Sequence, residues 1–322
     1  MTKVIRIGTR DSELALWQAN TVKEKIEDLG YKTELVSVKS TGDLILDKPL
    51  YELGITGIFT KTLDVAMLNG TVDIAVHSMK DVPTLLPQGI VQTAVLKRAS
   101  SEDILVTNTE IDYEKYFDKL STSPCTIATG SLRRKAQWLH RYPHHTIVDL
   151  RGNVNTRLQK LKDNNWQGAI FAKAGLERLR FLHSTKIKSP SFGGAGETLD
   201  WMIPAPAQGA MVVVALENDS FCKEVTSKLN HKNSDICTHV EREFLKTLEG
   251  GCTAPIGALA IIINDVIQFK GVLFSLDGNK KIEIERSISI NNYPSFGKKC
   301  AQQVLENGGK ELMQHIKRQF DK

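Results

Sequence analysis

The stretch VIRIGTRDSELALWQANTVKEKIEDLGYKTELVSV, residues 4–38, decides the expected fold. Val4 to Gly8 is predicted as a strand, and Thr33 to Val38 alternates polar with apolar residues as a second strand does. Between them, apolar residues recur at spacings of three and four, which predicts a helix that Ser12 can cap and Gly30 ends. The stretch therefore predicts a strand–helix–strand unit.

The same alternation continues for most of the chain and predicts a mostly parallel sheet with helices on both faces. Ser184 to Gly196 is rich in Ser, Gly and Pro and is predicted as a loop. After about Val225 the pattern changes to a helix that ends at Gly250, antiparallel strands and two C-terminal helices separated by a glycine pair. Further strands are expected at Val72–Val76, Ile104–Thr107, Thr126–Thr129, Thr146–Asp149, Gly168–Phe171 and Met211–Leu216, and further helices around Leu63 and from Ser131, Asn153 and Lys173.

The composition is that of a globular protein. Of its 322 residues, 41% are hydrophobic and 25% are charged. A chain of this length usually forms more than one hydrophobic core, so two or three domains are expected. A net charge of +5 is too small to indicate nucleic acid as a partner. No apolar run approaches the roughly 18–20 residues that cross a bilayer. Lys3 and Arg6 interrupt the apolar stretch that a signal peptide would need, so a cytoplasmic protein is expected.

The five cysteines are widely scattered, and none forms a CxxC pair. The sequence therefore predicts neither a zinc site nor a disulfide framework, and no metal is expected. Cys252 stands apart because it follows Glu249-Gly250-Gly251, a flexible turn after a helix, where an exposed thiolate would be a nucleophile. The alternative is a small buried apolar residue. That role is assigned to Cys125, Cys222, Cys237 and Cys300.

Arginines gather where strands pass into helices. They occur in Thr9–Ser12, Ser131–Arg134 and Arg151–Arg157, each beside an expected helix N-terminus at the carboxyl end of a strand. Free N–H groups and the helix dipole favour anions there, and the planar guanidinium group binds carboxylates through two hydrogen bonds. The pattern predicts a site for a polycarboxylate or a phosphate. The alternative is that these arginines form surface ion pairs.

Asp81 is a second candidate for chemistry. It follows a buried strand, lies next to Lys80, and is followed by Pro83, which restricts the chain. A carboxylate there could accept hydrogen bonds from substrate N–H groups and stabilise a developing cation. The alternative is a loop-capping residue paired to Lys80, and His77 is expected to be structural. Walker A, GxGxxG, HExxH and GxSxG motifs are absent, which removes the usual support for nucleotide, dinucleotide, zinc-protease and serine-hydrolase functions.

Taken together, these segments resemble the porphobilinogen deaminase family, also called hydroxymethylbilane synthases, along nearly the whole chain. HSMKDVP (residues 77–83) and EGGC (residues 249–252) are the most specific motifs. The others, in the family's order, are IGTR (7–10) with LALWQA (14–19), GD (42–43), GSLRR (130–134), LRGNV (150–154) with TRL (156–158), and QGA (208–210).

The resemblance implies an α/β fold with two periplasmic-binding-protein-like domains of type 2 and a small C-terminal α/β domain. The first domain would comprise residues 1–100 and 203–222, the second 101–202, and the third 223–322. It also implies a monomer that takes porphobilinogen as its small-molecule substrate and has no nucleic-acid or membrane partner.

The resemblance also implies a dipyrromethane cofactor joined to Cys252 by a thioether, on which four porphobilinogen molecules condense with loss of ammonia. Asp81 matches the family's catalytic aspartate. The other residues implied to bind cofactor are Lys80, Thr129, Ser131, Arg133, Arg134, Arg151 and Gly152. Those implied to bind substrate are Arg10, Ser12, Arg151, Arg157 and Gln208.

The chain departs from the family in one loop. Many members carry two lysines between Gly42-Asp43 and Phe59, where this sequence has Glu52 and Thr56. Weaker or rearranged contacts to the cofactor carboxylates are expected there. Two other functions stay open from the residues alone. One is a module that clamps a small anion without chemistry, and the other is a thiol enzyme that uses Cys252 as its nucleophile.

Overall fold

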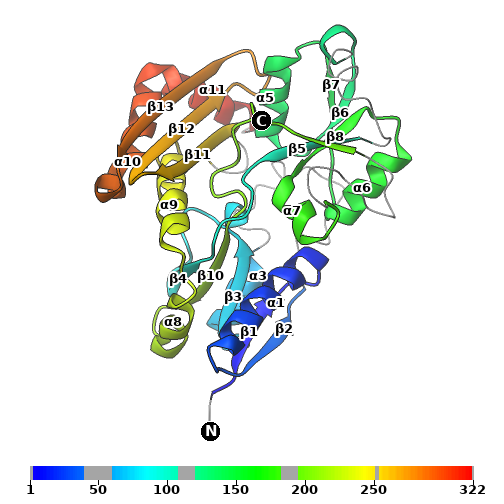
Figure 1. Cartoon of the computed structure of the whole chain (residues 1–322). Coiled ribbons are helices and arrows are strands. Elements are labelled where there is room, and N and C mark those ends of the chain that lie inside the picture. The colour runs from blue at the N-terminus through cyan, green and yellow to red at the C-terminus, as the bar shows by residue number, and fades with distance from the viewer. Residues whose placement is uncertain (1–2, 40–59, 108–119, 183–194, 251–253, 321–322) are drawn as a thin grey trace.

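The computed structural model describes residues 3–39, 60–107, 120–182, 195–250 and 254–320. They form three sheets, and we call each sheet with the helices that pack on it a domain (Figure 1). In the first sheet the strand order is β2-β1-β3-β10-β4, with β10 antiparallel to both of its neighbours. Its strands are β1 (Ile5–Thr9), β2 (Thr33–Ser37), β3 (Ile74–Ser78), β4 (Ile90–Val95) and β10 (Met211–Leu216).

Helices cover both faces of the first sheet. On one face, α1 (Glu13–Asp28) and α8 (Ser220–Ser227) pack through residues such as Val22 and Val225. On the other face, α3 (Lys61–Leu68) packs through Leu63 and Met67, as its apolar spacing predicts.

The second sheet repeats this topology. Its order is β7-β6-β8-β5-β9, in which β6, β7 and β8 are parallel and β5 is antiparallel to both β8 and β9. Its strands are β5 (Asp103–Thr107), β6 (Thr126–Ala128), β7 (Thr146–Val148), β8 (Gly168–Ala172) and β9 (Ala195–Thr198). Its helices are α5 (Leu132–Arg141) on one face and α6 (Val154–Asp163) and α7 (Lys173–Arg178) on the other.

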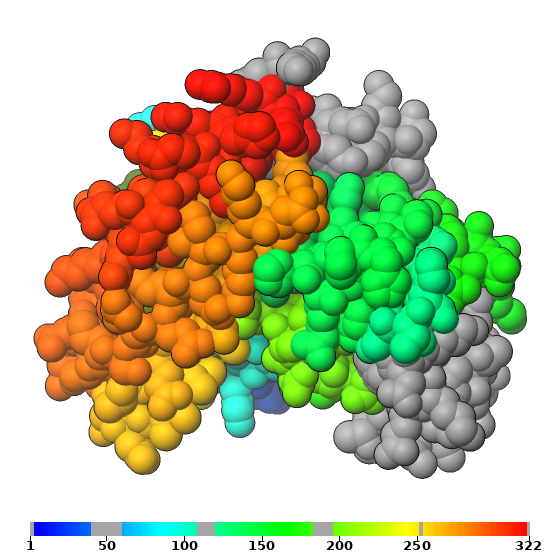
Figure 2. All heavy atoms as spheres, turned by 90° about the horizontal axis from the view of Figure 1, so that it is seen from above, coloured from blue at the N-terminus to red at the C-terminus, as the bar shows by residue number. Residues whose placement is uncertain are grey.

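The third domain is a three-stranded antiparallel sheet covered on one face by helices. Phe244 and Val240 of α9 lie at the centre of its core. The sheet contacts the second domain where Val272 and Phe274 pack on Ala136 of α5, so these two domains lie side by side when seen from above (Figure 2). Its elements are α9 (Lys232–Thr247), β11 (Ile256–Ile263), β12 (Val266–Phe274), β13 (Lys281–Ser289), α10 (Phe296–Val304) and α11 (Lys310–Phe320).

The expected fold class is therefore confirmed: two α/β domains of one topology and a small C-terminal α/β domain. In each five-stranded sheet, four of the strands run in one direction, as predicted, and the antiparallel strand is the one that enters from the other domain. The sequence analysis did not identify β4, and β9 lies partly inside the segment predicted as a loop. Ser12 occupies the N-cap position of α1, but its side chain makes no capping hydrogen bond. The segment between Gly42-Asp43 and Phe59, in which the sequence departs from the family, lies outside the described residues.

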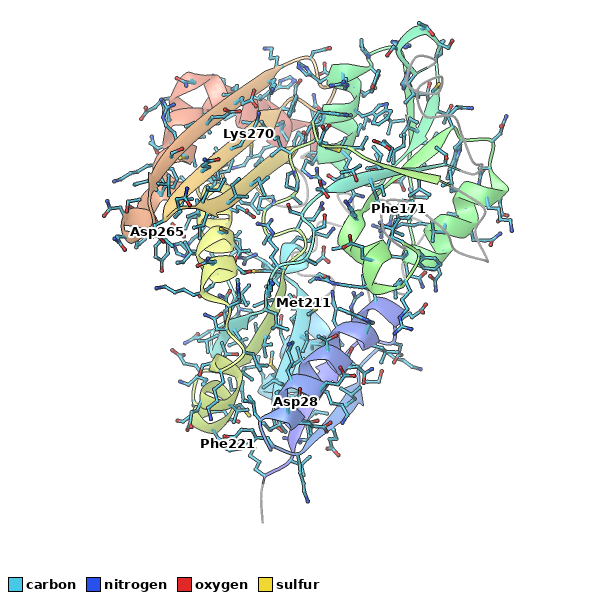
Figure 3. All side chains as sticks on the ribbon, in the orientation of Figure 1. Asp28, Phe171, Met211, Phe221, Asp265 and Lys270 are labelled. Atoms are coloured by element: carbon cyan, nitrogen blue, oxygen red, sulfur yellow. The ribbon has the colours of Figure 1, made fainter. Side chains whose placement is uncertain are left out.

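Two chain segments cross between the first and second domains, before β5 and before β10. They run side by side, because the Ala99 amide donates to the Gly209 carbonyl at 3.2 Å and the Leu96 amide to that of Met211 at 3.0 Å. Gly209 has a φ of +87°, and a Cβ there would lie 2.4 Å from the Ser100 carbonyl oxygen. Only glycine permits this approach. Met211, labelled in Figure 3, lies where the first domain meets the other two.

A buried ion pair joins this crossing to the third domain. Glu241 of α9 is fully buried and accepts from both terminal nitrogens of Arg98, at 2.6 and 3.1 Å. It also accepts from the amides of Ala207, at 2.6 Å, and Ala260, at 2.8 Å. One carboxylate thus connects both crossing segments with α9 and β11.

Among the described residues, no helix is long and apolar enough to cross a membrane.

We expect Glu241→Gln to destabilise the chain, because Arg98 would lose its buried partner. Removing one member of a buried pair costs about 3–5 kcal/mol. Urea denaturation should show this cost as a lower free energy of unfolding. Glu243→Gln on the same helix is the matched control, since its pair with Lys246 is half exposed and should contribute little. Equal effects of the two substitutions would contradict this role for Glu241.

Candidate active site

The predicted functional segments follow the carboxyl ends of parallel strands in both domains. Asp81 lies in a single 3₁₀ turn, Met79–Asp81, directly after β3, and Ser131 and Asn153 begin the helices that follow β6 and β7. Here side chains of the first and second domains interact through their charges and through hydrogen bonds. We call the following residues the interdomain cluster: Lys80, Asp81, Asp103, Arg133, Arg134, Arg151, Arg157 and Gln208.

Arg157 shows that the two domains meet in this cluster. Burial lowers its pKa to about 10, helped by the positive charges of Arg134 and Arg151, while Asp81 in the first domain acts in the opposite direction. Its Nε donates to the Gly152 carbonyl at 2.7 Å, which directs the guanidinium group back along the start of α6. Asp81 of the first domain and Arg134 and Arg151 of the second therefore all lie within electrostatic reach of Arg157.

A buried carboxylate holds two of the arginines. Asp103, the first residue of β5, is fully buried. Its Oδ2 accepts from Arg133 Nη1 at 2.6 Å, and its Oδ1 accepts from Arg134 Nε at 3.0 Å, with Arg134 Nη2 at 2.8 Å. Both guanidinium groups keep the pKa of Asp103 well below its usual value against the opposing effect of burial. Their remaining bonds go to backbone carbonyls of Ile203 and Ile170.

Gln208 links this arrangement to the first domain. It is fully buried, and its Nε2 donates to Asp103 Oδ1 at 3.0 Å and to the Ser101 carbonyl at 2.8 Å. Its Oε1 accepts from Lys80 Nζ at 3.3 Å. Both ends of the amide are engaged inside the protein, so Gln208 belongs to this network, and its expected contact with substrate stays a prediction.

Lys80 is an unusual lysine because it lies among several charged groups. Burial lowers its pKa to about 8, and the neighbouring charges act in both directions. Asp81 and Asp103 raise the pKa, whereas Arg134 and Arg133 lower it. The protonation of Lys80 near neutral pH therefore depends on the charges that surround it.

Helix starts arrange the second-domain residues as the sequence predicts. The Ser131 side chain accepts from the Arg134 amide at 3.4 Å and so caps α5, and Thr129 Oγ1 accepts from the Ser131 amide at 3.3 Å. Gly152 has a φ of +111°, and a Cβ there would lie 2.7 Å from the Thr156 side chain. Glycine is therefore required beside Arg151, which is buried and whose pKa burial lowers.

Arg10 and Ser12 follow β1 on the first-domain side. Burial lowers the pKa of His77 to about 3, and the positive charge of Arg10 acts in the same direction. His77 is 6% exposed, in keeping with its expected structural role. Cys252, Glu52 and Thr56 lie outside the described residues. The other cysteines are buried, as predicted.

The sequence analysis missed Asp103, although it holds two of the predicted arginines. Its signal was an acidic residue directly before an apolar strand, a place where a charge is costly unless it is paired. A cavity of about 690 Å³ lies elsewhere, between α1, α7 and the segment after α8. None of the interdomain cluster lines it, so we do not assign the chemistry to it.

The interdomain cluster fits a ligand that carries several carboxylates. Its five cations, Lys80 and four arginines, outnumber the carboxylates of Asp81, Asp103 and the neighbouring Asp149, which leaves a surplus of positive charge. Arg133 Nε is buried without a hydrogen-bond partner among the described residues. Guanidinium groups bind carboxylates in a fixed geometry, so an oligopyrrole with acetate and propionate groups matches this donor set.

Comparisons with known proteins agree with this chemistry. Residues 5–224 match the family model described as porphobilinogen deaminase, dipyromethane cofactor binding domain, and residues 236–306 match its C-terminal domain. A porphobilinogen deaminase of Campylobacter hominis is 40% identical over 96% of this chain and 97% of its own length. One of Nitratiruptor sp. is 42% identical over 96% of each chain.

A solved arginine-transport periplasmic binding protein from Legionella pneumophila covers 71% of this chain and 92% of its own, at 11% identity and a TM-score of 0.40. We draw nothing from a likeness at that score. The family models cover most of the sequence, and the relatives match it almost from end to end. On these grounds the chain belongs to the porphobilinogen deaminase family.

Proposed function

We propose that this chain performs the family's reaction at the interdomain cluster, with Asp81 as the catalytic carboxylate and Cys252 as the attachment point of the primer. The family joins four porphobilinogen molecules into hydroxymethylbilane on a dipyrromethane cofactor and releases ammonia. The observation that carries the proposal is that Asp81 in one domain lies within electrostatic range of Arg134 and Arg157 in the other. A carboxylate beside surplus cations suits a cationic reaction centre on an anionic chain.

Asp81 would stabilise the cation that remains when porphobilinogen loses ammonia. Its carboxylate can also accept hydrogen bonds from pyrrole N–H groups and so orient the ring. Preorganised charge of this kind is most effective where charge develops during the reaction. Asp81 lies in the short turn after β3, so its carboxylate would be in place before substrate arrives and little reorganisation would be needed.

The second-domain arginines and Lys80 would hold the acetate and propionate groups. Thr129, Ser131, Arg133, Arg134, Arg151 and Gly152 are proposed for the cofactor, and Arg10, Ser12, Arg151, Arg157 and Gln208 for the substrate. When bound, the dipyrromethane supplies the pyrrole carbon to which each new unit is added. Each addition brings two more carboxylates, which the surplus cations can neutralise.

A thioether to Cys252 would keep the growing chain at the site, so that successive additions occur at one held end. We also propose that the chain acts as a cytoplasmic monomer and divides into domains at residues 1–100 with 203–222, 101–202, and 223–322. The way the crossing segments meet the third domain at Glu241 supports this division.

We expect intact-mass spectrometry of the purified chain to show an adduct of two pyrrole units that Cys252→Ala abolishes. Cys237→Ala is the matched control and should keep the adduct, because Cys237 is buried and burial raises its pKa to about 12. An unmodified wild-type chain with full activity would rule out the tethered primer.

We expect Asp81→Ala to bind porphobilinogen but to release ammonia about 10²–10³-fold more slowly, the usual cost of losing one electrostatic stabiliser of the reaction centre. Stopped-flow assay of ammonia release measures this. The exposed Asp163→Ala serves as control and should keep the wild-type rate. Wild-type turnover in Asp81→Ala would move Asp81 to a structural role.

We expect the KM for porphobilinogen to rise as the pH increases through about 8, because Lys80 then loses the proton that lets it hold a carboxylate. Below that pH the lysine is cationic and its contribution is fully present. In Lys80→Met the KM should be higher and this limb of its pH profile should be absent. An unchanged limb in the variant would assign the titration to another group.

A further inference from the structure

The turn that carries Asp81 is short, and its own bonds do little to fix the carboxylate. The Met79 amide donates to the Ala210 carbonyl at 3.0 Å, and the Val82 amide to that of Met79 at 3.2 Å. The Asp81 carboxylate has no hydrogen-bond partner among the described residues, although charged groups lie within electrostatic reach. Its position therefore depends on the backbone of the turn.

Arg242 of the third domain holds that backbone from outside. Its Nη1 donates to the carbonyls of Met79, at 3.2 Å, and Val82, at 2.9 Å, and its Nη2 donates to the carbonyl of Pro83 at 2.6 Å. These three carbonyls flank Asp81 on both sides. One rigid guanidinium group thus sets the spacing of the residues before and after the carboxylate.

Within the part of the chain that the structure describes, the charge of Arg242 forms no ion pair. No carboxylate of the described residues lies within ion-pair distance of it, and burial alone lowers its pKa to about 10. An unpaired cation is costly to bury, so carbonyl dipoles must compensate it. Lysine carries its donors on one nitrogen and cannot reach three carbonyls with the same planar fork.

Its position in the sequence connects this contact to the rest of the molecule. The preceding residue, Glu241, binds the crossing segments, so one turn of α9 fixes both the crossing and the Asp81 turn. The same helix leads in sequence toward Cys252.

We propose that Arg242 is a positioning residue that holds the Asp81 turn at the reacting centre from the third domain. The inference rests on the proposed function, since it assumes that Asp81 is the catalytic group. Arg242 acts through the backbone and does not touch substrate. Its loss should therefore lower kcat and leave binding almost intact, because misplacement of a catalytic group affects chemistry more than affinity.

The test compares Arg242→Met and Arg242→Lys in the primer-loaded enzyme. Arg242→Met should lower kcat about 10²-fold, the scale of a misplaced catalytic group, and leave the KM near the wild-type value. Arg242→Lys should recover part of the loss. Hydrogen exchange, which needs no activity, should show faster exchange of the Met79 and Val82 amides in both variants than in wild type. Intact mass must show the primer in place.

Arg286→Met is the matched control, because Arg286 is an exposed arginine of the third domain whose guanidinium group donates, among the described residues, to the adjacent Glu285 carbonyl. It should keep wild-type kcat and exchange. A wild-type kcat in Arg242→Met, or a raised KM with unchanged kcat, would overturn the inference while leaving the role of Asp81 intact. Full turnover in Asp81→Ala would instead refute the proposed function. Should Arg242→Met fail to fold, Arg242→Lys decides by the same two measurements.

Discussion

The carboxylate of Asp103 lies between two guanidinium groups at the point where the chain passes from the first domain into the second. Adjacent arginines at one helix start would repel each other without it, and a buried aspartate would be unstable without them. Gln208 adds the returning segment to the same group. One buried interaction therefore fixes the crossing, the start of α5 and the arginines that face Asp81.

A second set of contacts arises from α9. Glu241 and Arg242 are neighbours, yet they contact different parts of the molecule: the first binds the crossing segments and the second the turn of Asp81. Through these contacts the third domain stabilises the position of the Asp81 turn in the first domain, and it also contains the proposed primer cysteine. Val272 and Phe274 of the third domain also pack against Ala136 of the second domain.

The balance of charge explains why this site suits an anionic chain. Asp103 neutralises part of the charge of Arg133 and Arg134, and the carboxylates of Asp81 and Asp149 lie within electrostatic range of Arg157. What remains is positive and largely buried, where charges interact more strongly than in water. A growing oligopyrrole carries the opposite charge, and in the proposed reaction the carboxylate of Asp81 would stabilise the cation that forms.

The sequence by itself determined the local elements, because periodicity, caps and glycine positions act over short distances: α1, α3, β10 and the helix starts at Ser131 and Asn153 all follow from it. It also indicated Asp81 and the arginines through recognisable motifs. Only the tertiary structure decided their partners. Asp103, Gln208 and Arg242 act on residues distant in sequence, and no local pattern states which carboxylate or carbonyl a side chain will meet once the domains have packed.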